Sequence, residues 1–371
     1  HRWGQSAEFD FEQKVFHPAI LHYRRATELN PRSATYWLDL ARAYETSGEA
    51  DHARGAFERA KTAHPISSEV AWRFGSFLLR RGQLSLALAE LRRSFLAAPG
   101  LLQPALDLCW RASRDVELIL DGLLPPESRF YLQALAYFIS RQEIDPALAT
   151  WNRFQALGRP FEFRRVIPLL NALIREDRLA EARDVWQQAL AVSRVRPDQP
   201  GRLPAVWNGG FEKELLGGGF GWRKPRVAGA SVDFDTTTAR AGQRSLRITF
   251  DGSTNLNFQH LVQYVLVEPH SRYHFQAFLR TEAISSDSGM RFRIYDPRRP
   301  ASLDVVTPNL VGTVPWSPQE VQITTGPETR LLAIALRRLP SRKLDNKLQG
   351  SVWVDDVSLT SLGNPGTPRS P

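Results

Sequence analysis

Cysteine, methionine and long apolar runs are almost absent from this sequence of 371 residues. Its one cysteine, Cys109, cannot form a disulfide within the chain and lies in the apolar segment LLQPALDLCW, which favours a small buried side chain over a nucleophile. The one methionine is Met290, and a start at His1 fits either a removed signal peptide or anchor, or a piece of a longer chain. Because no run of 18 apolar residues occurs, membrane attachment is expected only through an anchor outside the visible chain.

Blocks of like charge are also missing, although the formal net charge is +9. The basic residues are spread along the chain without a run of five or six. Nucleic-acid binding requires a clustered basic face, so nucleic acid is not expected as a partner. The net positive charge is compatible with an acidic polysaccharide or an anionic lipid as a partner.

Common catalytic motifs are missing as well. No GxSxG, HExxH, P-loop or CxxC motif occurs, and the eight histidines show no metal-ligand spacing. A glycosidase needs two carboxylates that face each other across a cleft, about 5–10 Å apart. The acids that could supply them in the second half are Asp233, Asp235, Asp287, Asp296 and Asp304. The sequence therefore predicts a protein without enzymatic activity, and a glycan-active enzyme stays open as an alternative.

The first half carries a repeated pattern of helix pairs. A window of 34 residues from Ala34 to Ser67 matches the signature of a tetratricopeptide repeat. The matching residues are Trp37, Leu40, Ala41, Tyr44, Gly48, Ala53, Phe57, Ala60 and Pro65. The window from Ser68 to Leu101 repeats the pattern. Apolar stripes on two successive helices, a small residue between them and a proline at the end predict two helices packed face to face.

The pattern continues on both sides of these two windows. Residues Ala19 to Pro31 match the second helix of a partial repeat, and the stretches Tyr131–Phe154 and Leu169–Ala189 predict two further pairs. The segment from Asp115 to Pro126 is expected to interrupt the array because it contains two adjacent prolines. We therefore predict an α-solenoid of about five helix pairs over residues 1–192.

The second half has the pattern of a β protein. Residues 193–204, SRVRPDQPGRLP, are rich in proline, glycine and charge and are predicted to be a linker. Short segments such as RSLRITF, YHFQAFLRT and SVWVDDVSL then alternate in polarity between turn residues. They predict an antiparallel β-sandwich over residues 205–362. Residues 363–371, GNPGTPRSP, are predicted to be a flexible tail.

Several short motifs of this half occur in a recognisable order. They are NGGFE at 208–212, Gly221-Trp222, ARAGQRSL at 239–246, VEP at 267–269 before YHF at 273–275, Gly312-Thr313 with Trp316, and VDDV at 354–357. In this order the region resembles the carbohydrate-binding modules of the family 4, 9 and 22 type. The resemblance implies a galactose-binding-like jelly roll that binds a glycan.

The same resemblance implies a structural calcium ion. Its ligands would be Glu212 with Asp355 or Asp356, completed by backbone carbonyls near Asn208 and Gly210. Calcium takes hard oxygen ligands and accepts carbonyl groups among them. The alternative is that Glu212 caps a turn and that hydrogen bonds alone hold the two ends of the domain together.

A candidate glycan surface follows from strand alternation. On YHFQAFLR, one face carries His274, Gln276, Phe278 and Arg280. From strands expected to be its neighbours, Gln259, Gln263, Arg291, Arg293 and Tyr295 would join this surface, with Trp316 as a further candidate. Aromatic rings stack on sugars, planar polar groups pair with hydroxyls, and the arginines suit an acidic polysaccharide. The alternative for each residue is an ordinary solvated position on an open sheet face.

These features predict a binding and scaffold protein outside the cytoplasm. Its array would contact a protein partner or copies of itself, and its sandwich would bind a polysaccharide. This combination resembles proteins associated with the assembly and export of bacterial surface polysaccharides. The alternative is a structural subunit of a self-assembling extracellular filament or surface layer, in which both domains make protein contacts.

Overall fold

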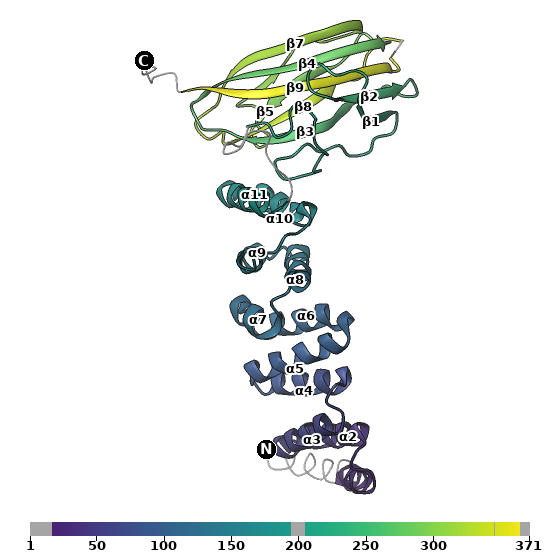
Figure 1. Ribbon diagram of the computed structural model, residues 1–371, viewed down its shortest axis with the longest axis vertical. Coiled ribbons are helices and arrows are strands. Elements are labelled where there is room, and N and C mark those ends of the chain that lie inside the picture. The colour runs from purple at the N-terminus through teal and green to yellow at the C-terminus, as the bar shows by residue number, and fades with distance from the viewer. Residues whose placement is uncertain (1–16, 194–204, 345, 364–371) are drawn as a thin grey trace, which may run out of the picture. The chain divides into compact units, whose positions relative to one another are not determined.

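The computed structural model describes residues 17–193, 205–344 and 346–363. The predicted linker after Ser193 and the predicted tail after Gly363 lie outside these ranges. The chain divides into two compact units, His1–Gly158 and Arg159–Pro371. In their described parts the first unit is helical and the second holds two antiparallel sheets (Figure 1). The predicted fold class, helical repeats followed by an antiparallel β-sandwich, is confirmed.

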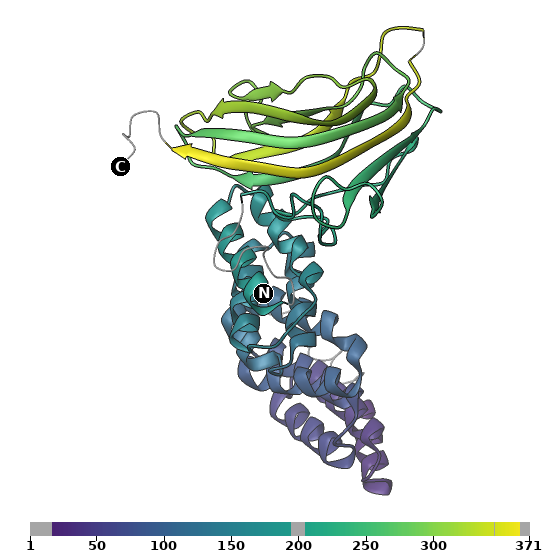
Figure 2. The same cartoon turned by 45° about the horizontal axis from the view of Figure 1, so that its top comes forward.

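The first unit is built from helix pairs joined by short turns (Figure 2). A helix covers residues 17–29, where a partial repeat was predicted. It is followed by α2 (Ala34–Thr46), α3 (Ala50–Ala63), α4 (Ser68–Arg80), α5 (Leu84–Ala97), the 3₁₀ turn η1 (Pro99–Leu101), α6 (Leu102–Ser113), α7 (Val116–Leu123), α8 (Ser128–Ser140) and α9 (Ile144–Ala156). Among the helices described in the chain, none is both long and apolar enough to cross a bilayer.

The signature residues of the repeats lie where the helices pack. Ala41 of α2 and Ala53 of α3 are fully buried, as expected for small residues between two close helices. In the next pair, a Cβ on Gly75 of α4 would lie 2.8 Å from Cγ of Leu91 on α5. The two windows with the best signature therefore fold as predicted.

The segment expected to interrupt the array is itself part of a helix pair, α6 with α7. The Asp115 carboxylate accepts a hydrogen bond of 3.0 Å from the N–H of Leu118 and so caps the start of α7. At the other end, the Arg92 guanidinium donates to the carbonyls of Asp121 (2.9 Å) and Leu123 (3.0 Å). The prediction of an interruption from Asp115 to Pro126 was wrong because the prolines only end a short helix that is capped at both ends.

Cys109 lies on α6 and is fully buried. Burial raises the pKa of its thiol to about 12, so the thiol stays protonated at neutral pH. The expectation of a buried small side chain is confirmed.

The second unit begins with helices and continues as the sandwich. Its elements are η2 (Phe163–Arg165), α10 (Ile167–Arg175), α11 (Leu179–Val192), β1 (Ala230–Asp235), β2 (Ser245–Asp251), β3 (Phe258–Leu266), β4 (Arg272–Ile284), β5 (Arg291–Tyr295), β6 (Asp304–Val306), β7 (Gly312–Thr324), β8 (Leu331–Arg338) and β9 (Gln349–Gly363). One sheet has the order β1-β2-β9-β4-β7 and the other the order β3-β8-β5-β6. The long strands β4 and β9 run side by side in the five-stranded sheet (Figure 1).

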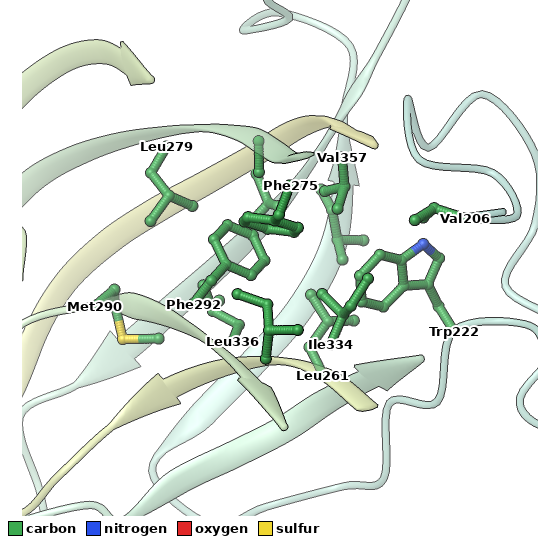
Figure 3. Close-up of a cluster of buried hydrophobic side chains, with 14 of the residues drawn as sticks. Val206, Trp222, Leu261, Phe275, Leu279, Met290, Phe292, Ile334, Leu336 and Val357 are labelled. Carbon is green, nitrogen blue, oxygen red and sulfur yellow. The ribbon is translucent and has the colours of Figure 1, made fainter. Parts of the chain in front are cut away.

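The core of the sandwich lies between the two sheets. Phe275 of β4 and Phe292 of β5 come from different sheets, and their ring centres are 5.1 Å apart (Figure 3). Ile334 and Leu336 of β8 and Trp222 of the opening segment lie in the same cluster. Burial of this cluster fixes which side chains of each strand face outward and can meet a ligand.

The last helix pair packs against the sandwich within the second unit. Trp186 of α11 makes edge-to-face contacts with Trp207 and Phe220, each with ring centres 5.7 Å apart. Asn171 of α10 accepts a hydrogen bond of 2.9 Å from the N–H of Gly219. The division between the units therefore falls between residues 158 and 159, upstream of the linker predicted at 193–204.

Candidate functional site

The residues predicted to bind a glycan lie on two different sheets. His274, Gln276, Phe278 and Arg280 are on β4 of the five-stranded sheet, whereas Gln259, Gln263, Arg291, Arg293 and Tyr295 are on β3 and β5 of the four-stranded sheet. The expectation that β3 and β5 neighbour β4 was wrong, because both strands belong to the other sheet, and β4 lies between β9 and β7. The predicted residues therefore form two candidate surfaces, one on each sheet, in place of the single surface that was predicted.

The outer face of the four-stranded sheet carries a connected set of polar side chains. Nε2 of Gln259 donates to the Tyr295 hydroxyl (2.9 Å), and Nη1 of Arg293 donates to Oε1 of Gln259 (3.2 Å). Arg293 also makes two hydrogen bonds of 2.8 Å to the Asp304 carboxylate. These bonds reach from β5 to β3 over the central strand β8, whose small Ala335 is the register partner of Arg293. The network holds four side chains in one arrangement on this face.

Two guanidinium groups on the same face have no carboxylate partner. Arg291 of β5 is the register partner of Arg337 on β8, and neither forms an ion pair among the described residues. Nε of Arg291 is buried without a hydrogen-bond partner there. Burial and the positive charges of Arg293 and Arg291 lower the pKa of Arg337. Like charges on directly opposite residues normally destabilise a sheet.

Gln263 is not part of this surface. It is fully buried, its Oε1 accepts the N–H of Trp207 (2.8 Å), and its Nε2 donates to the Trp207 carbonyl (2.7 Å). A register irregularity between Phe258 and Leu261 shifts the alternation of β3, so Gln263 faces inward. The assignment of Gln263 to a ligand is therefore corrected: it anchors the opening segment of the sandwich.

On the five-stranded sheet, two predicted residues share one acidic neighbour. Nε2 of Gln276 donates to Oε1 of Glu320 on β7 (2.5 Å), and Nε2 of His274 lies 3.8 Å from the other oxygen of Glu320. All three side chains are exposed or half-buried. Their polar groups are therefore partly engaged within the protein.

Arginines cover the aromatic side chains of this sheet. The guanidinium carbons of Arg247 and Arg280 lie 5.0 and 5.3 Å from the ring centre of Trp353, their common register neighbour on β9. The Trp353 indole N–H donates to Asp235 (2.8 Å), and hydrogen bonds from Thr237 and Trp353 lower the pKa of Asp235 to about 2. Trp353 is only 4% exposed, so the charges and not the ring face the solvent.

Phe278 and Trp316 lie beside this arrangement. The guanidinium carbon of Arg240 is 3.4 Å from the ring centre of Phe278. Trp316 is half-buried on β7, at the register irregularity between Leu279 and Thr281 of β4. A hollow of about 1440 Å³ is lined in part by Gln276, Phe278 and α11, so the β4 residues border a second candidate site.

The acidic residues predicted to bind calcium lie close together around Gly210. A Cβ there would be 3.8 Å from Oδ1 of Asp356, 3.9 Å from Oδ1 of Asp355 and 4.0 Å from Cγ of Glu212. Asn208 is buried nearby, and its carbonyl accepts the Trp222 indole N–H (3.2 Å). The structure thus brings together the side chains that the sequence motifs pointed to.

Each of these carboxylates has a partner in the loop before β2. Oδ2 of Asp355 accepts the N–H of Arg240 (2.9 Å), Oε1 of Glu212 accepts the N–H of Gln243 (2.9 Å), and Asp356 pairs with the Arg240 guanidinium. Burial raises the pKa of Asp355. Within the described residues, no group of three or more histidine, cysteine or acidic side chains is placed to hold a metal ion. The oxygen donors suit calcium, which would need backbone carbonyls as well and the release of Asp356 by Arg240.

No protein-family model and no curated protein matched the sequence. Several solved structures are similar to parts of it. A structure described as "Family 16 Carbohydrate Binding Module-2" is 16% identical, covers 42% of this chain and 99% of its own, and has a TM-score of 0.31. One described as "CBM4 structure and function" is 13% identical with the same coverage and TM-score. One described as "Crystal structure of MamA" is 16% identical, covers 48% of this chain and 90% of its own, and has a TM-score of 0.24.

Sequence reasoning missed the two arginines at the end of β8. Arg337 and Arg338 are adjacent in RLLAIALRRL, and alternation turns the first outward and the second into the sandwich. The sequence feature that could have revealed them is an arginine pair at the end of a wholly apolar strand, since one member of such a pair must face the core. Only the register of β8 against β5 reveals that Arg337 lies opposite Arg291.

Proposed function

We propose that this protein is a non-enzymatic scaffold that binds a polysaccharide through its β-sandwich and a protein through its helical repeats. The polar network of Gln259, Arg293 and Tyr295 on the four-stranded sheet is the observation that carries the glycan part. Amide, guanidinium and phenol groups are suited to pair with sugar hydroxyls. Because hydrogen bonds already fix these side chains, a ligand would lose little entropy in ordering them.

The helical repeats support the protein-binding part of this proposal. Stacked helix pairs expose an extended surface that can bind another chain or a copy of the same chain. We propose such a contact for the repeats of the first unit.

The proposed setting is outside the cytoplasm, in the assembly or export of a bacterial surface polysaccharide. The motif order that resembles carbohydrate-binding modules supports this setting. A binding role without catalysis is supported by the acids of the sandwich: Asp235, Asp296 and Asp304 each bond to neighbouring side chains of the protein.

We also propose that calcium binds near Gly210, with carboxylate ligands from among Glu212, Asp355 and Asp356 and backbone carbonyls as further ligands. Carboxylate and carbonyl oxygens are the hard donors that calcium prefers, and an ion bound only by the folded state raises the melting temperature. Thermal unfolding of the full chain is expected to shift upward in millimolar CaCl₂ relative to EDTA, and Asp356→Asn is expected to reduce the shift. Equal melting temperatures in CaCl₂ and EDTA would mean that hydrogen bonds alone hold the cluster.

Polysaccharide binding can be assigned to a face with two matched variants. Affinity electrophoresis of the full chain in gels with bacterial surface polysaccharides is expected to retard the wild type. Gln259→Ala is expected to weaken retention about 10-fold, since it removes a hydrogen-bonding group and loosens Tyr295. Gln276→Ala, the same change on the five-stranded sheet, is expected to leave retention unchanged. An effect of Gln276→Ala alone would move the site to the other face, and no retardation by any polysaccharide would refute glycan binding.

A further inference from the structure

The outer face of the four-stranded sheet has a charge arrangement that neutral sugars would not require. Arg291 and Arg337 lie directly opposite each other on β5 and β8, and Arg293 lies two residues from Arg291 on the same face. Asp304 makes both of its 2.8 Å hydrogen bonds to Arg293 and acts on Arg337 only from a longer distance. Two positive charges therefore face each other in a half-buried setting without an ion-pair partner among the described residues, where repulsion is screened less than in water.

Arg291 has no visible role in holding the fold. Its side chain forms no hydrogen bond, ion pair or ring contact among the described residues, and its Nε is buried without a partner. Arg338, one position after Arg337, shows the contrast, since it is fully buried and donates to backbone and side-chain oxygens of three loops. A half-buried guanidinium that opposes another one without a partner costs stability unless something outside the chain pairs with it.

Arg337 is held in position but keeps donors free. Its Nη1 donates to the carbonyls of Phe258 (3.2 Å) and Arg338 (3.0 Å) and to the side chain of Asn257. Its Nη2 has no partner among the described residues. An oriented guanidinium with a free edge, beside a second one, can bind a carboxylate or sulfate with paired charge-assisted hydrogen bonds.

We propose that Arg291 and Arg337 form a binding site for the negatively charged group of an acidic polysaccharide, a uronate carboxylate or a sulfate ester. This proposal rests on the proposed glycan-binding function and names its ligand class. Gln259 and Tyr295 lie beside the pair on the same face, where they can meet the hydroxyls of the sugar that carries the charge.

The same face is poorly suited to single-stranded nucleic acid. Binding of that kind needs aromatic rings with a free face on which bases stack. Here the guanidinium carbon of Arg293 lies 4.2 Å from the ring centre of Tyr295, and that of Arg223 lies 4.4 Å from the ring centre of Tyr264. Covered rings and two half-buried guanidinium groups without a carboxylate partner favour a ligand recognised by charge.

The test measures binding of the full chain to polygalacturonate and dextran sulfate, with unsubstituted dextran and methyl-esterified pectin as neutral counterparts. Arg291→Gln is expected to weaken binding to at least one acidic polymer on the order of 10-fold, the effect of one lost hydrogen bond to a charged group. Its melting temperature is expected to equal or exceed that of the wild type, because repulsion with Arg337 is relieved. Arg272→Gln removes an exposed arginine from β4 of the other sheet, outside the candidate binding residues, and is expected to leave binding unchanged.

Four outcomes would overturn this proposal without refuting the helical or sandwich fold, and a fifth would also refute glycan binding. The four are equal affinity of Arg291→Gln and wild type for the acidic polymers, a lower melting temperature of Arg291→Gln, tighter binding of an oligonucleotide than of any acidic polymer, and binding of neutral polymers alone. The last would leave the glycan-binding function standing and remove only its charge preference. Failure to bind any polysaccharide, acidic or neutral, would remove both.

Discussion

Replacing Arg338 by methionine is expected to lower the free energy of unfolding of the second unit by about 3 kcal/mol or more, because several buried acceptors lose their hydrogen-bond donor at once. The side chain is fully buried. Its guanidinium donates to the carbonyls of Ser288 (2.9 Å) and Asn346 (3.0 Å) and to the side chains of Asn255 (2.8 Å) and Ser286 (2.9 Å). These residues belong to three separate loops, so a single side chain joins them.

The loss is large because methionine fills the volume but leaves the acceptors without a donor. Each buried oxygen left without a hydrogen bond costs about 1–3 kcal/mol. Urea unfolding of the full chain, followed by tryptophan fluorescence, measures the change. Arg337→Met, the adjacent outward position, is the matched control and is expected to cost less than Arg338→Met, because Arg337 is only half-buried and its removal also relieves the repulsion with Arg291. Equal losses for both variants would mean that the bonds of Arg338 contribute little.

Alanine at Gly209 is expected to destabilise the sandwich by about 3 kcal/mol, whereas alanine at Gly210 is expected to change little. The Gly209 carbonyl accepts the N–H of Val357 on β9 (3.0 Å), and a Cβ on Gly209 would overlap with the Val357 carbonyl oxygen. A Cβ on Gly210 meets nothing closer than 3.8 Å. Because backbone atoms cannot rotate away as side chains do, the opening segment would have to leave β9.

The two glycines are neighbours in the same motif, so the pair separates a local steric effect from a general effect of the motif. Thermal unfolding of both variants beside the wild type measures the difference. Similar melting temperatures for Gly209→Ala and Gly210→Ala would contradict the close backbone approach. A large decrease in melting temperature for Gly210→Ala alone would mean that the close backbone contact is at Gly210 and not at Gly209.

Features that depend on one segment of sequence were predictable. The stripe of Ala41 and the facing Ala53 follow from helical spacing, and the burial of these small residues confirms it. The proximity of Glu212 to Asp355 and Asp356 joins two distant segments, and it was predictable only because the resemblance links the opening segment of the domain to its last strand. In both cases the sequence pattern itself indicates which residues lie close together in space.

Features that depend on how strands meet were not predictable. Alternation on β4 placed His274 and Arg280 on one face correctly, but it cannot say which strands lie beside β4. The extra residue at the start of β3 reversed the direction of Gln263, and no composition rule marks that position. The opposition of Arg291 and Arg337 arises from strand order, a property of the whole sandwich.

The contact between α11 and the sandwich has a consequence for how the protein can be divided. Trp207 and Phe220 are 4% and 7% exposed, and both rest against Trp186. A fragment that begins after the predicted linker at residues 193–204 would lack Trp186 and would expose these two apolar rings to water. An exposed apolar patch of this kind binds chaperones and promotes aggregation. A fragment that begins near residue 159 would retain α11, whose Trp186 covers both rings. Expression of the ligand-binding part alone in soluble form therefore requires α10 and α11, which the repeat pattern had assigned to the helical array and not to the sandwich.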